Sequence, residues 1–550
     1  MSSTDASVEA GSKHPVMDEW VDRSQIEMME TDIQAKQDAT FNYMSGWKSH
    51  VTMTALGLAL FLVNLELTII GTALVSITND LHDFVKASWV VTAYLITYTT
   101  GLVIWAKVSD HIGRKQAYMA SLITFSAFAG GCGAAQTMVQ LIVCRAFQGL
   151  GAGGVYAVAI VMLYELKPPE KYAQVTSVSA GAAALGNALG PIFGGLISQG
   201  TTWRWVFLLN VPSGVVAAIV VFFVVPNNFP YQGLLRRKPQ LKFRTLDFTG
   251  AFLMLTALAL LISGLEQAAT LLYWTSATVI VPICVSVVVW VAFFASQWYF
   301  TRPTSSVEPV FPWRFCQDRE MMGLLVNSFM TGSVSITCII QLPIRYQTSV
   351  GASPLQAGVR LLPFVLCGPL GVILTASISK KRRVPPLYLA LAASILQMLG
   401  LIFMSRGPAD NPDWKPLYGL EVLTGLGMGI SIGIVTLLTP YVAEKRDLAV
   451  ASAAGTQFRF LGSAFVVSIT TAVGNGWVKG QLSSSLTSSQ IDQVFQSTSS
   501  IYQLPESLQP AVRSTFVKGF NLEMHIVLGF AVTSVLSIAL MWRRNPIRVE

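Results

Sequence analysis

The chain has few charged residues and lacks two common enzyme signatures. Only 12% of its 550 residues are Asp, Glu, Lys or Arg, whereas 52% are hydrophobic. That balance excludes a soluble globular domain of ordinary composition. There is no GxxxxGK[ST] phosphate loop and no HExxH zinc motif, so the sequence supports neither nucleotide hydrolysis nor zinc-dependent peptide hydrolysis. We therefore expect a polytopic membrane protein that is not an enzyme.

Cysteine is also scarce and follows no pattern. The six cysteines lie singly, without a CxxC pair or a His/Cys spacing typical of metal sites, so we expect buried thiols, no metal and no cofactor. No Asn-x-Ser/Thr sequon occurs, which argues against N-glycosylation. The first 50 residues contain no apolar leader segment. We therefore expect no cleaved signal peptide and expect the first hydrophobic segment itself to direct the chain to the membrane.

Hydrophobic segments dominate the remaining sequence. Each is long enough to cross a bilayer as a helix, which takes about 17 to 25 residues. We predict an all-α protein with about fourteen transmembrane helices. The expected segments are 51–77, 88–106, 118–136, 139–164, 175–198, 205–225, 248–265, 274–294, 321–342, 355–378, 386–404, 417–440, 449–474 and 522–542.

Lysine and arginine cluster in every second loop and at the carboxyl end. The positive-inside rule therefore predicts that both termini are cytoplasmic. The net charge of +8 resides in these short loops and not in a basic-aromatic patch, so no nucleic-acid partner is expected. The expected divisions are a tail (1–50), a six-helix half (51–226), cytoplasmic loops with two inserted helices (227–320), a second six-helix half (321–542) and a tail (543–550). The long outer loop 475–520 is rich in Ser and Gln and is expected to be disordered or to form a cap.

The sequence repeats itself at a nearly constant interval. GLGAG at 149–153 recurs as GLGMG at 425–429, an offset of 276 residues. Glu-Lys at 170–171 recurs at 444–445, and Ala-Gly at 180–181 recurs at 454–455, both with an offset of 274. These matches predict two homologous six-helix halves separated by an inserted helix pair. The alternative is chance agreement among common small residues.

Two neighbouring segments carry small residues at helical spacing. The fourth segment has a stripe with a period of four, Arg145, Gly149, Gly153 and Ala157. The fifth segment has a second stripe, Ala182, Gly186, Gly190 and Gly194, interrupted by Pro191. Small residues let helix backbones approach closely, and proline removes a backbone hydrogen bond. We therefore expect close packing along both faces and a bend in the fifth helix.

Charged residues inside membrane segments are costly and usually functional. With no nucleotide site in view, transport against a gradient would need an ion gradient and a titratable group in the membrane. Glu66 lies mid-segment and is the best candidate for proton exchange, with Arg145 as the nearest obvious partner type. The competing interpretation is structural, a carboxylate permanently paired with an arginine or an arginine satisfied by nearby carbonyl groups.

Other polar residues inside the segments could line a substrate cavity. Arg360 and Arg459 are expected to be the buried cations of the second half, and they would either bind an anionic substrate or lock helices together. The remaining cavity candidates are Asn64, Gln148, Gln341 and Gln457.

The loop after the second segment reads AKVSDHIGRKQAY. Asp110, Arg114 and Lys115 surround a turn at Gly113, where they could pair with each other or with a helix end. The loop is either simply solvated or a latch between the halves that controls which side opens.

Several stretches of the sequence resemble motifs of a known protein family. AKVSDHIGRK resembles the loop signature GxxxDxxGRK of the major facilitator superfamily, with Ala106 in place of glycine. LIVCRAFQGLGAGG is similar to its fourth-helix signature, and GNALGPIFGG to the fifth-helix GPxxGG signature associated with antiporters. The fourteen segments, LELTIIGTALVSI, WVVTAYLIT and WRWVFLLNVPSG resemble the fourteen-span drug:proton antiporters. SPLQAGVRLLP and the acidic tail look most like fungal members that export toxins and secondary metabolites.

The resemblance implies a fold, a mechanism and roles for residues. Three positions depart from the family: Glu66 replaces Asp, Gly71 replaces Asn and Ser76 replaces Pro. By resemblance, Asp110 and Arg114 would stabilise the outward-facing state through contacts with the other half, and Arg145 would tune proton release. The cytoplasmic gate would comprise Asp110, Gly113, Arg114 and Lys115, and the antiporter hinge Gly186, Gly190, Pro191, Gly194 and Gly195.

Our leading hypothesis is a proton-coupled exporter of amphipathic small molecules that works by alternating access. We expect a monomer in the lipid of the plasma membrane, or of a vacuolar or vesicular membrane. The alternatives are a proton-coupled importer of a siderophore or nutrient and a non-transporting membrane sensor. The GPxxGG signature favours export, by resemblance only.

Overall fold

The structure is a computed structural model that describes residues 43–168, 171–227, 229, 247–271, 275–302, 307, 309–381, 384–443, 448–496 and 498–543. Most of the two expected tails, 1–50 and 543–550, lies outside the described residues, and so do residues 230–246 of the expected segment 227–320.

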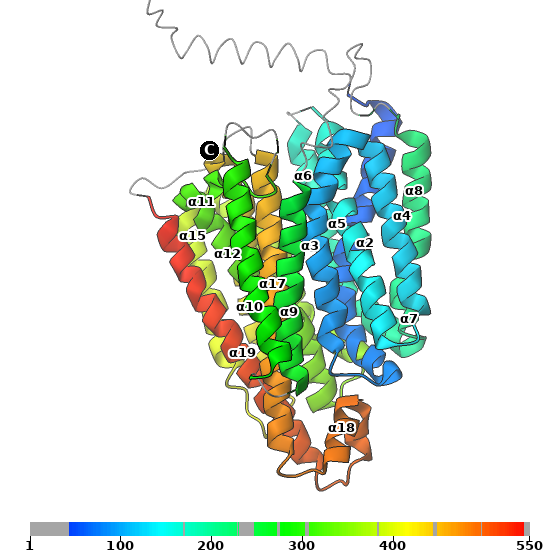
Figure 1. Ribbon diagram of the computed structural model, residues 1–550, viewed down its shortest axis with the longest axis vertical. Coiled ribbons are helices and arrows are strands. Elements are labelled where there is room, and N and C mark those ends of the chain that lie inside the picture. Colours follow the sequence, from blue (N-terminus) through cyan, green and yellow to red (C-terminus); the bar gives the residue numbers. More distant parts are fainter. Residues whose placement is uncertain are drawn as a thin grey trace, which may run out of the picture.

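The described chain is a bundle of helices without strands (Figure 1). Fourteen helical segments are long and apolar enough to cross a membrane, which confirms the predicted number and the all-α class. The first half contains α2 (Gly46–Leu81), α3 (Ala87–Ile112), α4 (Arg114–Ala134), α5 (Met138–Glu165), α6 (Tyr172–Gly200) and the broken span α7 (Arg204–Leu208) with α8 (Asn210–Val224). The inserted pair is α9 (Phe248–Leu271) and α10 (Ala277–Phe300), followed by the short α11 (Arg314–Gln317).

The second half repeats this order. It contains α12 (Arg319–Arg345) with a π-helical extension (Tyr346–Val350), α13 (Pro354–Arg360) with α14 (Leu362–Lys381), α15 (Pro386–Met404), α16 (Pro416–Val442), α17 (Leu448–Leu482) and α19 (Gln509–Leu540). Between the last two lie α18 (Ser488–Gln496) and a 3-10 turn (Thr498–Gln503).

Successive spans run in opposite directions, so the loops alternate between two ends of the bundle. We call the end with the α3–α4 turn the Gly113 end, which is at the top of Figure 1, and the opposite end the α18 end. The inserted helices α9 and α10 pack against each other, and α9 also contacts α3 of the first half and α17 of the second.

Glycine packing shows the same arrangement in both halves. A side chain on Gly149 or Gly153 of α5 would strike the backbone of α3 at Tyr94 or Tyr98. In the second half, Gly425 and Gly429 of α16 lie in the same way against α14, at Phe364 and Gly368. The fourth helix therefore packs closely on the second helix in each half, and the internal repeat is a structural one.

The segment expected to be a long outer loop is mostly helical. Within 475–520, α17 continues to Leu482, α18 follows, and α19 begins at Gln509. Its apolar residues form a small buried cluster that includes Leu482, Val494 and Phe516 and that also contains Phe84 of the first half. The apolar residues of this Ser-rich stretch recur at helical spacing, so α18 buries one face in this cluster. The segment therefore forms a cap over the α18 end.

Candidate functional site

One carboxylate and one guanidinium meet inside the first half. Glu66 of α2 and Arg145 of α5 are each 1% exposed, and Glu66 Oε1 lies 2.5 Å from Arg145 Nη1. The two predicted residues therefore contact each other in this conformation. Because both are removed from solvent, their attraction is only weakly screened, but each has also lost its hydration.

Further hydrogen bonds hold both members of this pair in place. Asn210 Nδ2, at the start of α8, donates to Glu66 Oε2 at 2.5 Å. Arg145 Nη1 donates to Gln148 Oε1 at 2.8 Å, and Arg145 Nε donates to the Val90 carbonyl at 3.0 Å. The sequence interpretation missed Asn210, although it lies in the quoted stretch WRWVFLLNVPSG, where it is the one amide in an apolar run.

Aromatic rings enclose the guanidinium. Arg145 lies 4.1 Å from the centre of the Tyr94 ring and 5.5 Å from that of Phe207. These contacts between the guanidinium and the ring faces are favourable for a cation. The site thus holds one titratable carboxyl, one cation and an amide donor, all buried inside the first half.

The small-residue face of α6 packs on the helix that carries Glu66. A side chain on Gly186, Gly190 or Gly194 would overlap α2, at Phe61, Thr68 and Ile69 respectively. Thr72 Oγ1 of α2 also donates to the carbonyl of Pro191, which lies inside the continuous helix α6, at 3.2 Å.

Contacts between the halves close the α18 end. Gly358 of α13 lies against the Pro191 carbonyl, and Gly195 lies against Leu355. Gln347 Nε2 donates to the Thr72 carbonyl at 3.2 Å, and the Phe84 amide donates to the Phe495 carbonyl at 3.1 Å. Two of the predicted hinge residues, Pro191 and Gly195, therefore lie at the interface, whereas Gly186, Gly190 and Gly194 pack within the first half.

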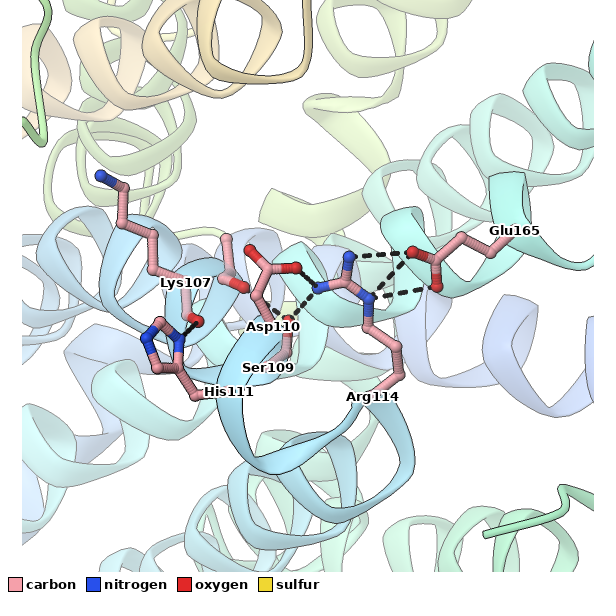
Figure 2. Close-up of polar contacts among 7 residues, drawn as sticks. Lys107, Ser109, Asp110, His111, Arg114 and Glu165 are labelled. Carbon is pink, nitrogen blue, oxygen red and sulfur yellow. Dashed lines mark hydrogen bonds and ion pairs between the residues drawn. The ribbon is translucent and has the colours of Figure 1, made fainter. Parts of the chain in front are cut away.

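At the Gly113 end, the loop motif forms a polar cluster (Figure 2). Arg114 lies between Asp110, at 2.5 Å, and Glu165 at the end of α5, at 2.8 Å. It also donates to Ser109 Oγ at 2.6 Å. Gly113 has a φ of 104°, a conformation that glycine adopts without a Cβ clash.

Lys115 serves a different purpose. It is 8% exposed, and its Nζ donates to the carbonyl groups of Phe222 and Val225 and to Asn227 Oδ1, at 2.6 to 2.9 Å. A cation at the C-terminal end of α8 satisfies carbonyl groups that the helix leaves open. The partners of Arg114 belong to the first half, and those of Lys115 lie in the last turn of α8 and directly after it.

The six cavity candidates are not brought together. Asn64 donates to the Leu60 carbonyl of its own helix at 2.7 Å, and Gln148 belongs to the Glu66 site. Gln457 contacts Met254 Sδ of α9 at 3.1 Å. Gln341 alone of the six lines the cavity between the halves at the α18 end.

The prediction that Arg360 and Arg459 are the buried cations of the second half is wrong. The Arg360 side chain is 25% exposed and pairs with Asp413 at 2.7 Å, and Arg459 is only partly buried. The buried cation is Arg345, which is 2% exposed. The predicted segment 321–342 stopped short of it because hydropathy falls at a charged residue, whereas α12 and its extension continue to Val350.

The comparisons with known proteins agree with this architecture. The family model of the Major Facilitator Superfamily matches residues 56–467. The MFS-type transporter FPY5 of Fusarium mangiferae is 37% identical over 524 residues, which cover 94% of this chain and 88% of the relative. The MFS thioclapurine efflux transporter tcpA of Claviceps purpurea is 28% identical over 446 residues, which cover 80% of each chain.

A solved structure shares the fold. A bacterial homolog of the human lysosomal transporter Spinster, in an inward-facing and unoccupied conformation, superposes with a TM-score of 0.65 at 15% identity. The match covers 91% of this chain and 100% of that one. The family model spans well over half of the sequence, and the protein therefore belongs to the Major Facilitator Superfamily and is a membrane transporter, not an enzyme.

Proposed function

We propose that this transporter exports amphipathic small molecules, of the toxin, drug or secondary-metabolite kind, in exchange for protons. The similarity to a thioclapurine efflux transporter supports export. The observation that supports proton coupling is the buried contact of Glu66 with Arg145 and Asn210, because a titratable carboxyl in a helix long enough to span the membrane is a candidate proton carrier.

Protonation of Glu66 would change the charge of this site. The ion pair has no net charge, so a proton on Glu66 leaves Arg145 as an uncompensated buried cation, a costly arrangement. Arg145 would keep its bonds to Val90 and Gln148, and Asn210 could still bind the neutral acid. The site would therefore favour a rearrangement that rehydrates or re-pairs Arg145, and α2 would transmit it to the packed α6.

The proposed cycle is alternating access between the two halves. By the positive-inside rule, the Gly113 end, where α2 begins and α19 ends, would face the cytoplasm. In that orientation, the contacts at Pro191, Gly195, Thr72 and Phe84 close the outward path. Reversal would require Asp110 and Arg114 to exchange contacts within the first half for contacts with the second. We place the transporter, as a monomer, in the plasma membrane or a vacuolar membrane.

The test is efflux from a transporter-deficient yeast that expresses the native chain or Glu66→Gln. Accumulation of a panel of amphipathic compounds is measured with and without a protonophore, at matched surface expression. We expect the native chain to lower the accumulation of at least one compound and the protonophore to abolish this effect. Cells that express Glu66→Gln should accumulate as much compound as cells without the transporter. Asp80→Asn, the same acid-to-amide change at an acid of α2 whose side chain is 49% exposed, serves as the control.

Two results would contradict the proposal. Efflux by Glu66→Gln against a gradient would place coupling elsewhere. Proton-driven uptake into cells by the native chain, with no export of any compound, would make the protein an importer.

A further inference from the structure

The second half carries charged residues on the counterparts of the three helices that form the Glu66 site. In the first half, the site is built by the first, fourth and sixth helices, α2, α5 and α8. Their counterparts α12, α16 and α19 carry Arg345, Glu421 and Glu523. Glu421 follows Arg145 by 276 residues, the offset that also separates Gly149 from Gly425. The signs are exchanged: here the first helix carries the cation and the fourth the acid.

These groups lack the pairing seen in the first half. Arg345 is 2% exposed, and none of its three guanidinium nitrogens has a hydrogen-bond acceptor among the described residues. Its guanidinium lies 4.7 Å from the centre of the Phe520 ring. Glu421 instead accepts a hydrogen bond from Tyr346 Oη at 2.6 Å. A buried guanidinium without an acceptor is rare and costly, so it calls for a partner from outside the protein.

Glu523 is in the same situation. It is 8% exposed, and no hydrogen bond or ion pair joins it to any other described residue. A side chain on Gly474 of α17 would overlap the Glu523 carboxyl. The glycine therefore makes the room that this acid occupies.

Arg345 and Glu523 line one cavity between the halves at the α18 end. Its volume is about 40 Å³ in this closed conformation, enough for one or two water molecules. Gln341 adds a polar group, whereas Leu74 and Phe84 of the first half and Phe516 of the second add apolar walls. Because the walls come from both halves, the cavity would widen when the α18 end opens.

We propose that this cavity binds the acidic head group of an amphipathic organic acid on its way out of the transporter. Arg345 donates to the carboxylate of the ligand, and Glu523 accepts from an N–H or O–H next to it. The apolar walls cover the first atoms of the hydrophobic body. This assignment rests on the proposed export function, since it names the class of molecule exported.

Three probes with one skeleton test the two contacts separately. N-octanoylglycine has both the acid and the N–H, N-octanoylglycinamide lacks the acid, and N-octanoylsarcosine lacks the N–H. Their binding to the purified full chain in nanodiscs is measured by calorimetry. We expect N-octanoylglycine to bind the native protein about tenfold more tightly than either analogue, the effect of one lost charge-assisted hydrogen bond.

Variants then assign the contacts to residues. Arg345→Gln is expected to remove the preference over the amide, and Arg345→Lys to reduce it, since lysine lacks the planar fork. Glu523→Leu, which has no acceptor, is expected to remove the preference over the sarcosine analogue and keep that over the amide. Arg406→Gln, an exposed arginine at the same end, is the matched control and should change neither preference.

The native protein alone can overturn the proposal, whether or not a variant folds. Equal binding of the three probes, or binding of none, would mean that the cavity holds only water. Retention of the acid preference in Arg345→Gln would also overturn it. These failures are separable from failure of the export proposal: efflux of neutral compounds that depends on Glu66 would persist in the first case and be absent in the second.

Discussion

Glu66 and Arg145 form an ion pair in the interior of the first half, with Oε1 and Nη1 2.5 Å apart and neither side chain more than 1% exposed. Each residue depends on the other because both have lost their hydration. The consequences for stability and for coupling can be separated by choosing which partner is removed.

Loss of Arg145 alone should destabilise the protein strongly. Arg145→Met leaves the Glu66 carboxyl with Asn210 as its remaining partner, and breaking a buried pair from one side costs about 3–5 kcal/mol. The double variant Glu66→Gln/Arg145→Met should recover much of this loss, because no charge is then left unpaired. Thermal unfolding of the detergent-purified variants measures both effects. Additive losses in the double variant would show that the two residues do not act as a pair.

Alanine substitutions at two glycines of α6, Gly181 and Gly190, should affect stability differently. A Cβ at Gly190 would approach Thr68 Cβ to 2.9 Å and the Ile69 amide to 3.0 Å, whereas a Cβ at Gly181 meets nothing within 4 Å. Gly190→Ala should therefore destabilise the α2–α6 contact by about 1–3 kcal/mol through overpacking. Gly181→Ala should be neutral or stabilising by up to about 1 kcal/mol, because alanine favours the helix.

The same thermal unfolding assay, together with efflux, compares the two glycine variants. If Gly190→Ala proved as stable as Gly181→Ala, the two helices would not approach as closely as described.

Most of the fold follows from the sequence because a bilayer demands long apolar helices. All fourteen expected segments coincide with spans, and the GLGAG and GLGMG repeats pack alike in the two halves. The errors occur where a segment leaves the bilayer. Hydropathy ended the ninth segment before Arg345 and gave no sign that the Ser-rich stretch around α18 is helical, because protein contacts, not lipid, bury those residues.

The sequence predicts only those residues of the site that are charged and lie within an apolar run. Glu66 and Arg145 stand out in that way, but Asn210 is neutral and lies 144 residues from Glu66. Its role depends on how α8 packs against α2, which no local pattern encodes. Glu421 and Glu523 carried the same signal as Glu66, acids inside apolar stretches, and the sequence interpretation passed over both.

The two carboxylates around Arg114 should substitute for each other. Asp110 and Glu165 lie on either side of its guanidinium and are partly exposed, at 43% and 23%. Asp110→Asn or Glu165→Gln alone should cost no more than about 1 kcal/mol, because one carboxylate remains. The double variant should lose more than the sum, since Arg114 is then unpaired.

A double-mutant cycle on thermal stability measures this coupling. A parallel loss of efflux in Asp110→Asn at unchanged stability would indicate that Asp110 also acts in another conformation. Strict additivity would contradict the shared role.

The last prediction concerns the cap at the α18 end. The Phe495 ring packs on Phe84 with 6.4 Å between centroids, and the backbones of these residues are hydrogen-bonded across the halves. Phe495→Ala removes the ring that covers the junction, so local opening of this end should become easier without global unfolding. Tyr502→Ala, at a residue of the same cap that is 52% exposed, is the control.

The opening is measured with a reporter cysteine, Ser88→Cys, in a chain whose native cysteines are replaced by serine. Ser88 lines the cavity and is 3% exposed. Labelling of this thiol by a membrane-impermeant maleimide should accelerate about tenfold with Phe495→Ala, as a loss of about 1.4 kcal/mol from the closed state would give. Unchanged labelling would mean that the contacts of α13 with α6 close this end by themselves and that the cap does not contribute to closing it.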